Sequence, residues 1–211
     1  MNYTTMTMFA PRIWGSDPEM RMARQAGWRR ADLIWERLSE AGNAALSQGR
    51  TGPAARAFRL AHLVAWLCFA RTDPRYATSL ANAGLMAMRR GRTGTGARRL
   101  ARARALWQRV PERLPDITIA PRARSSLFHL RMEARHRDTY HSNMRARLLG
   151  FVEETARALN DLSEGRATDL RFYSRWRGEK PNVFDDTRIY LSAALLLAGE
   201  HVDQARTPER Q

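Results

Sequence analysis

Three residues whose side chains bind metals recur at helical spacing near the middle of the chain. His129, Glu133 and His136 are four and three residues apart, so one face of a helix would present all three. Glu133-x-x-His136 is half of the di-iron carboxylate pattern, which needs a second copy and two further carboxylates. The sequence holds no second copy, and neighbouring arginines would oppose a cation. A metal-dependent all-α enzyme is therefore the lesser alternative, with exposed polar residues as the other interpretation, and we expect no cofactor.

The strongest charge feature is a run of arginines without acids. Residues 74–111 contain no Asp or Glu but nine arginines, and Arg98 and Arg102 would share one helical face. Like charges at this spacing repel by roughly a few tenths of a kcal/mol unless an anion relieves them. We expect a basic patch that docks an acidic protein or a phosphate backbone. The alternatives are a solvated face or pairing with acids in residues 153–169. The basic patch comprises Arg90, Arg92, Arg98, Arg99 and Arg102.

A second mixture of charge and aromatic rings lies near the C-terminus. Phe172, Tyr173 and Trp176 alternate with arginines that include Arg175. Such mixtures are enriched at protein-binding hot spots and at single-stranded nucleic-acid sites. The alternative is structural, with arginine stems laid over the rings at the end of the fold.

The glycines of the arginine-rich region form an echo. Gly91-Arg-Thr-Gly-Thr-Gly96 follows Gly49-Arg-Thr-Gly-Pro-Ala by 42 residues. The segment lacks the Gly-Lys-Ser/Thr ending and the preceding strand of a phosphate-binding P-loop. Its repetition indicates turns that each join two helices.

Composition indicates a helical globular protein. The 211 residues are 44% hydrophobic and 27% charged, with a net charge of +15. Lys180 is the only lysine among 36 basic residues, a bias that a GC-rich coding sequence would also produce. The single cysteine, Cys68, lies in an apolar run and is predicted to be buried. No run reaches the ~20 apolar residues of a membrane span, so we expect a cytoplasmic protein, bacterial in style, without membrane insertion.

Periodicity and capping residues predict the helices that position these groups. Ser16 or Asp17 before Pro18, Asp73 before Pro74, and Asp185 or Asp186 are predicted N-caps. A flexible arm (1–15) and a polar tail (206–211) would flank a single domain, 16–205. The predicted helices span about 16–48 (with a break near Gly27), 53–71, 75–90, 95–110, 121–136, 138–163 and 186–197.

The two echoed segments resemble tetratricopeptide repeats. Small and bulky residues follow that family's pattern in both copies: Gly42, Gly49, Ala54, Phe58 and Ala61, then Gly84, Gly91, Gly96, Leu100 and Ala103. Small residues would let the helices cross closely. The clearest repeats are 35–70 and 77–110, with 121–163 a diverged helix pair and 185–205 a terminal unit. The predicted fold is all-α, a short tetratricopeptide-like solenoid, with an irregular helical bundle as the alternative.

The resemblance implies a partner groove along the first helix of each repeat. Asn43 and Asn82 occupy positions where some family members hold a peptide carboxylate, although Ser39 stands where that clamp has a lysine. The expected function is a non-catalytic adaptor or assembly factor for a protein with an acidic surface. The alternative is a nucleic-acid-associated or regulatory protein. The groove residues implied are Asn43, Leu46, Asn82, Leu85, Met88 and Arg89.

Overall fold

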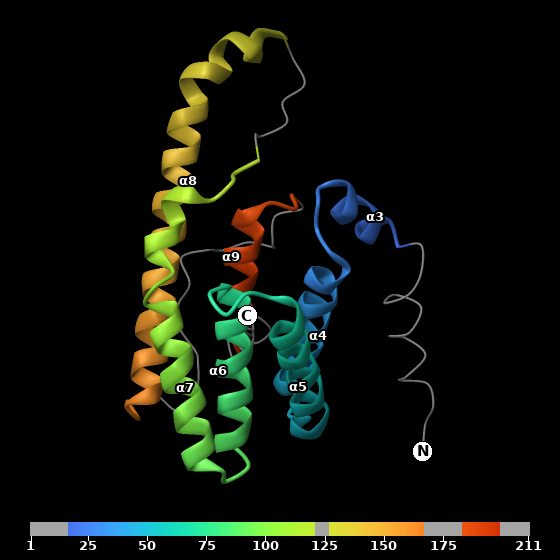
Figure 1. Ribbon diagram of the computed structural model, residues 1–211, viewed down its shortest axis with the longest axis vertical. Coiled ribbons are helices and arrows are strands. Elements are labelled where there is room, and N and C mark those ends of the chain that lie inside the picture. Colours follow the sequence, from blue (N-terminus) through green and yellow to red (C-terminus); the bar gives the residue numbers. More distant parts are fainter. Residues whose placement is uncertain (1–16, 121–126, 167–182, 199–211) are drawn as a thin grey trace, which may run out of the picture.

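The computed structural model describes residues 17–120, 127–166 and 183–198, and all regular structure in these ranges is helical (Figure 1). The all-α prediction is thereby confirmed. The solenoid arrangement stays a prediction. The flexible arm (1–15) and the polar tail (206–211) also stay predictions, because residues 1–16 and 199–211 lie outside the described ranges. The helices are α3 (Pro18–Gln25), α4 (Arg30–Ser47), α5 (Thr51–Cys68), α6 (Pro74–Met88), α7 (Thr93–Trp107), a 3-10 helix (Pro111–Asp116), α8 (Leu127–Ser163) and α9 (Asp186–Leu195).

The predicted capping residues begin three of these helices. Asp17, Asp73 and Asp185 accept hydrogen bonds from the backbone N–H groups of the first turns of α3, α6 and α9. Gly49 and Gly91 end α4 and α6 with φ angles of 71° and 74°, which side chains rarely allow. The echoed glycine segments are therefore turns within two antiparallel helix hairpins, α4–α5 and α6–α7.

Small residues allow the helices of each hairpin to approach closely. A Cβ on Gly42 of α4 would lie 2.4 Å from the Phe58 ring of α5. A Cβ on Gly96 of α7 would lie 2.9 Å from the carbonyl oxygen of Gly84 on α6 and closer still to Met88. The expected mechanical role of these glycines is thus present in both hairpins.

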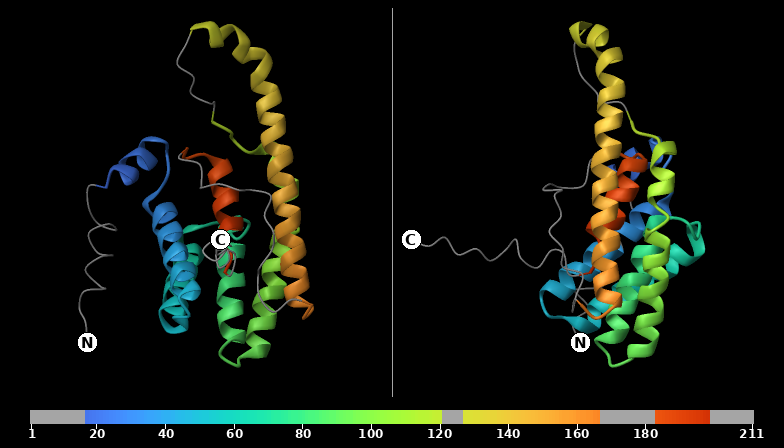
Figure 2. Two further views of the ribbon diagram at one scale, coloured as in Figure 1. Left: turned by 180° about the vertical axis from the view of Figure 1, so that it is seen from behind. Right: turned by 90° about the vertical axis from the view of Figure 1, so that its left-hand side faces the viewer.

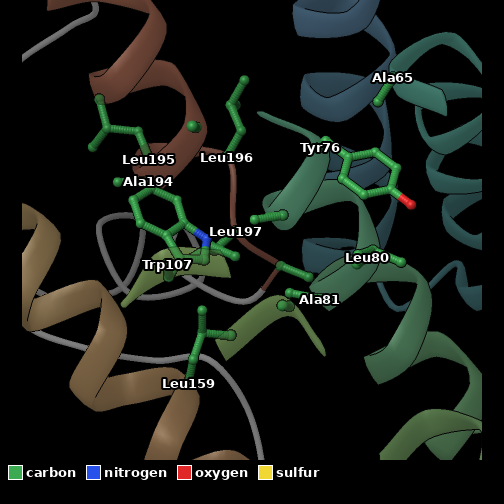
Figure 3. Packing of buried hydrophobic residues seen from close by; sticks show 14 of the residues in the cluster. Ala65, Tyr76, Leu80, Ala81, Trp107, Leu159, Ala194, Leu195, Leu196 and Leu197 are labelled. Atoms are coloured by element: carbon green, nitrogen blue, oxygen red, sulfur yellow. The ribbon is translucent and has the colours of Figure 1, made fainter. Parts of the chain in front are cut away.

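The two hairpins share one core with α8 and α9. Helix α8 runs alongside α7, and its N-terminal part extends beyond the other helices (Figures 1 and 2). Helix α9 packs against both α6 and α8. Figure 3 shows the centre of this core, where Leu195 and Leu197 of the α9 segment lie near Trp107 of α7. Trp107 and Leu197 are completely buried.

Two sequence predictions are wrong. Residues 127–163 form one continuous helix rather than two, because Asp138 alone, without Gly or Pro, does not interrupt it. Cys68 is exposed rather than buried. Helix α5 buries Phe58 and most of its alanines, and it leaves most of its larger apolar residues exposed. A continuous apolar run does not indicate which face of a helix will be buried, so the sequence could not predict this. Among the described helices, none combines the length and apolarity of a membrane span.

Candidate functional site

The groove implied along α4 and α6 is filled by the chain's own C-terminal segment. The side-chain amides of Asn43 and Asn82 both donate to the carbonyl oxygen of Leu196, at 3.2 and 2.9 Å. The Asn82 side-chain oxygen accepts from the N–H of Ala198 at 2.8 Å. Both asparagines therefore bind a peptide backbone, but one from the same chain. The prediction that they face a partner is corrected by this occupancy.

The other predicted groove residues divide between core and surface. Leu46 and Leu85 are buried, Met88 is half-buried against α7, and Arg89 is exposed. Leu46 and Leu85 belong to the shared hydrophobic core, so they do not line a surface groove. No continuous surface from Asn43 to Arg89 is open to a partner in the described structure.

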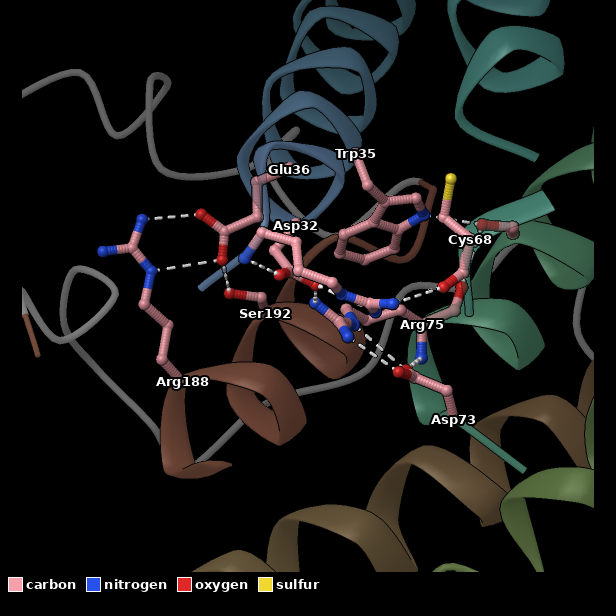
Figure 4. Close-up of polar contacts among 10 residues, drawn as sticks. Asp32, Trp35, Glu36, Cys68, Asp73, Arg75, Arg188 and Ser192 are labelled. Carbon is pink, nitrogen blue, oxygen red and sulfur yellow. Dashed lines mark hydrogen bonds and ion pairs between the residues drawn. The ribbon is translucent and has the colours of Figure 1, made fainter. Parts of the chain in front are cut away.

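A buried ion-pair network lies where α9 meets α4 (Figure 4). Arg188 of α9 donates to both carboxylate oxygens of Glu36, at 3.2 and 2.6 Å, and Ser192 donates to one of them. Glu36 and Arg188 are almost fully buried. Burial opposes the Arg188 charge, but hydrogen bonds and charges from Glu36 and Glu19 outweigh it and raise the pKa of Arg188 above its usual value.

A second buried pair joins α4 to α6. Arg75 donates to Asp32 at 2.6 Å and to Asp73 at 2.7 and 3.0 Å, and its guanidinium lies 3.9 Å from the centroid of the Phe69 ring. Nearby, the Trp35 indole N–H donates to Ser79 at 2.7 Å. All the acceptors of these two networks belong to the protein, so the networks are structural supports for α4, α6 and α9.

Sequence reasoning missed both networks. Asp32 and Glu36 stand four residues apart on the buried face of α4, next to Leu33 and Trp35, and this spacing was the local indication of buried charge. Their partner cations, Arg75 and Arg188, are distant in sequence, and nothing local distinguishes them from the many exposed arginines.

The basic patch is open on the outer side of α6 and α7. Arg90, Arg92, Arg98 and Arg102 are exposed, and Arg99 is half-buried, donating to the Ala83 carbonyl at 3.4 Å. Within the described residues no carboxylate pairs with any of the five. The acidic segment of α8 instead meets Arg104, which donates to Asn160 at 2.9 Å and lies 3.4 Å from Glu164. The side chains of α8 that the structure describes, from Tyr140 on, therefore do not neutralise the patch.

An aromatic–arginine seam, made of His62, Trp66, Arg71, Tyr76 and Arg102, joins the patch to α5. The Arg71 guanidinium lies 4.7 Å from the Tyr76 ring centroid and 5.4 Å from that of Trp66. Arg102 lies 6.0 Å from the Tyr76 ring, and His62 stacks on the same ring at 5.9 Å. Side chains of α5, α6 and α7 thus meet around the buried Tyr76 ring, with Trp66, Arg71 and Arg102 exposed at the surface.

Large apolar side chains continue this surface along α5. Leu60, Leu63, Trp66 and Leu67 expose 50%, 48%, 51% and 64% of their area. The three leucines are three and four residues apart and share one face of the helix. Contiguous exposed apolar residues of this size mark interaction sites on soluble proteins. We call these four residues the α5 apolar face.

The remaining predicted sites lie outside what can be described. Phe172, Tyr173, Arg175 and Trp176 fall in the undescribed segment 167–182. The structure describes the helical backbone of α8 at His129, Glu133 and His136, but it does not describe their side chains. Among the side chains that are described, no group of three metal-ligating residues is close enough to hold an ion.

Comparison with protein-family models finds no match, and comparisons with curated proteins and with solved structures find no similar protein.

Proposed function

We propose that this chain is a non-catalytic binding protein, an adaptor or assembly factor, that docks an acidic partner protein on the outer surface of α5–α7. The main observation that supports this proposal is that contacts among Trp66, Arg71, Tyr76 and Arg102 join the α5 apolar face to the basic patch. A partner segment with apolar residues on one side and carboxylates beside them would match both parts. Two tetratricopeptide-like hairpins would then serve as the scaffold that presents this surface.

Charge distribution supports an acidic partner. Asp73 is the only acidic residue between residues 41 and 111, and it forms an ion pair with Arg75. The exposed arginines of α5–α7 therefore create a positive field with no local counter-charge, which steers anionic partners and speeds their association.

The leucines favour a protein over nucleic acid. Arginines and aromatic rings would suit a single-stranded nucleic acid equally well, because bases stack on rings and phosphates pair with guanidinium groups. Exposed aliphatic side chains at Leu60, Leu63 and Leu67 gain nothing from a phosphate backbone but would be buried by an amphipathic protein segment. Nucleic-acid binding through the same surface is the second candidate.

The test is recovery of tagged protein from its native host after nuclease treatment, comparing three forms. They are the wild type, a patch variant (Arg98→Gln with Arg102→Gln) and a control variant (Arg21→Gln with Arg24→Gln), which removes two exposed arginines of α3. We expect a stoichiometric acidic protein on the wild type and control but not on the patch variant. Titration of that purified protein against Leu63→Ser would test the α5 apolar face.

Two results would contradict the proposal. Retention of the same protein by the patch variant at wild-type affinity would remove the basic patch from the interface. Material that disappears on nuclease treatment, with affinity falling steeply as salt rises, would replace the proposal by the nucleic-acid candidate.

A further inference from the structure

A pocket between α5 and α6 is lined by arginines that have no carboxylate partner among the described residues, together with apolar side chains. It is closed at one end by the α6–α7 turn, and arginines from three places line it: Arg59 of α5, Arg90 after α6 and Arg92 in the turn. All three side chains are exposed, and within the described residues none pairs with a carboxylate. Arg90 and Arg92 belong to the basic patch, whereas Arg59 and the rest of the pocket lining lie outside it.

The lining also contains a polar atom that lacks a partner. His62 lines the pocket beside Arg59, and its Nδ1 is buried without a hydrogen bond to any described group. Buried polar atoms in native proteins are almost always paired with protein groups, ordered water or a ligand, so this nitrogen is open to hydrogen bonding by a group that enters the pocket. Burial, together with the charges of Arg99, Arg71 and Arg102, lowers the pKa of His62, which favours the neutral ring.

The rest of the lining is apolar. Ala55, Phe58, Ala83, Met86 and Ala87 form the wall and floor. A ligand that fits this pocket therefore combines an anionic end for the arginines with an organic portion for the floor.

The number of donors selects the type of anion. Each guanidinium offers five N–H donors in a planar fork, and three of them surround one pocket. A carboxylate has two oxygens and one charge, whereas a phosphate monoester carries three free oxygens and nearly two charges. Phosphate thus satisfies more of these donors and removes more of the repulsion among the arginines.

We infer that the pocket lined by Arg59, His62, Arg90 and Arg92 binds the phosphate group of an organic phosphate ester. The site is distinct from protein docking on the α5 apolar face, and either assignment can fail without the other. The phosphate could belong to a free mononucleotide or to a nucleic-acid strand, and the choice of probes separates these two sources.

The experiment is titration calorimetry of the full chain with four probes: inorganic phosphate, uridine monophosphate, a single-stranded thymidine oligonucleotide and glutarate. We expect uridine monophosphate to bind more tightly than glutarate, because a phosphate concentrates nearly two charges on one group, whereas glutarate divides its two charges between separate carboxylates. Equal or tighter binding of glutarate overturns the phosphate assignment, as does absence of heat with every phosphate probe. If the oligonucleotide binds and the mononucleotide does not, the source is a strand.

Variants locate the binding. Arg59→Gln should weaken binding of uridine monophosphate by about tenfold or more, because a charge-assisted hydrogen bond is lost. Arg109→Gln removes the same charge from an exposed position on the chain outside the pocket and should leave affinity unchanged. Equal affinity of Arg59→Gln and wild type overturns the site. Folding of each variant is checked by its thermal midpoint.

The His62 ring gives an independent readout. A phosphate beside it favours the protonated imidazole, so its NMR titration should move to higher pH when uridine monophosphate is added. Assignment follows from the resonance that His62→Gln removes. A His62 titration that is identical with and without saturating ligand would overturn the placement of the phosphate next to this ring.

Discussion

Arg188 and Glu36 form a two-point ion pair inside the protein although 152 positions separate them in the chain. Substituting Glu36→Gln would remove the buried carboxylate that the Arg188 guanidinium contacts at two points. Breaking a buried pair on one side leaves an uncompensated charge, so we expect the free energy of unfolding to fall by about 3 kcal/mol. Chemical denaturation measures it.

The matched control is Glu153→Gln, at an exposed position of α8, which should change stability by less than about 0.5 kcal/mol. The double variant Glu36→Gln with Arg188→Met removes the orphaned cation as well. It should be more stable than Glu36→Gln alone. A double variant that is as unstable as the sum of both single changes would show that charge pairing is not the source of the loss.

Asn82 should contribute more to stability than Asn43. Both donate to the Leu196 carbonyl, but Asn82 also accepts from Ala198, whereas the Asn43 side-chain oxygen has no partner among the described groups. Asn43→Ala leaves the Leu196 carbonyl bound to Asn82. Asn82→Ala leaves the buried Ala198 N–H unsatisfied, at a cost of about 2 kcal/mol. Urea denaturation of both variants checks the order, and a larger loss for Asn43→Ala would contradict this account of how α9 is held.

Close helix crossing predicts opposite effects at two glycines of α7. Gly96→Ala would place a Cβ against the Gly84 carbonyl and Met88, and the helices would have to separate, at about 1–3 kcal/mol. Gly94→Ala meets nothing within 4 Å and should be neutral or stabilising by up to about 1 kcal/mol. Thermal denaturation compares them. Equal midpoints for the two variants would mean that α6 and α7 do not cross at Gly84 and Gly96.

Exposure of Cys68 predicts rapid labelling of the folded protein. A thiol-specific reagent should modify it in native buffer at a rate close to that in denaturant, because no folding barrier protects it. Cys68→Ser should also lower stability by less than about 0.5 kcal/mol. Protection of the thiol until the protein unfolds would instead favour the buried position expected from the apolar run.

The lowered pKa of His62 predicts a stability that depends on pH. The unfolded state binds a proton as pH falls through its ordinary value of 6.5, while the folded state resists protonation until lower pH. Stability from neutral His62 is therefore complete above that value and decreases as pH falls from it toward the lower folded pKa. Subtracting the pH profile of His62→Gln from that of the wild type isolates this contribution, and parallel profiles would contradict it.

The sequence by itself determined most of the helices and their ends, with α8 as the exception. Asp17, Asp73 and Asp185 act through hydrogen bonds within one turn, and Gly49 and Gly91 act through their own φ angles, so neighbours in the chain suffice to predict them. The small residues Gly42, Gly84 and Gly96 were also predictable, because the helix hairpins that they serve are local. The absence of acids in residues 74–111 was visible in the sequence, but pairing of the basic patch with acids of residues 153–169 stayed open there.

Tertiary structure alone decided which helical faces are covered and by what. Asn43 and Asn82 had the residue types of a peptide-binding groove, but only the return of residues 186–198 to α4 and α6 shows that their ligand is the Leu196 carbonyl. Arg75 and Arg188 differ from the exposed arginines only in the acids that distant segments bring to them. Burial and pairing are sums over long-range contacts, and no local pattern contains those contacts.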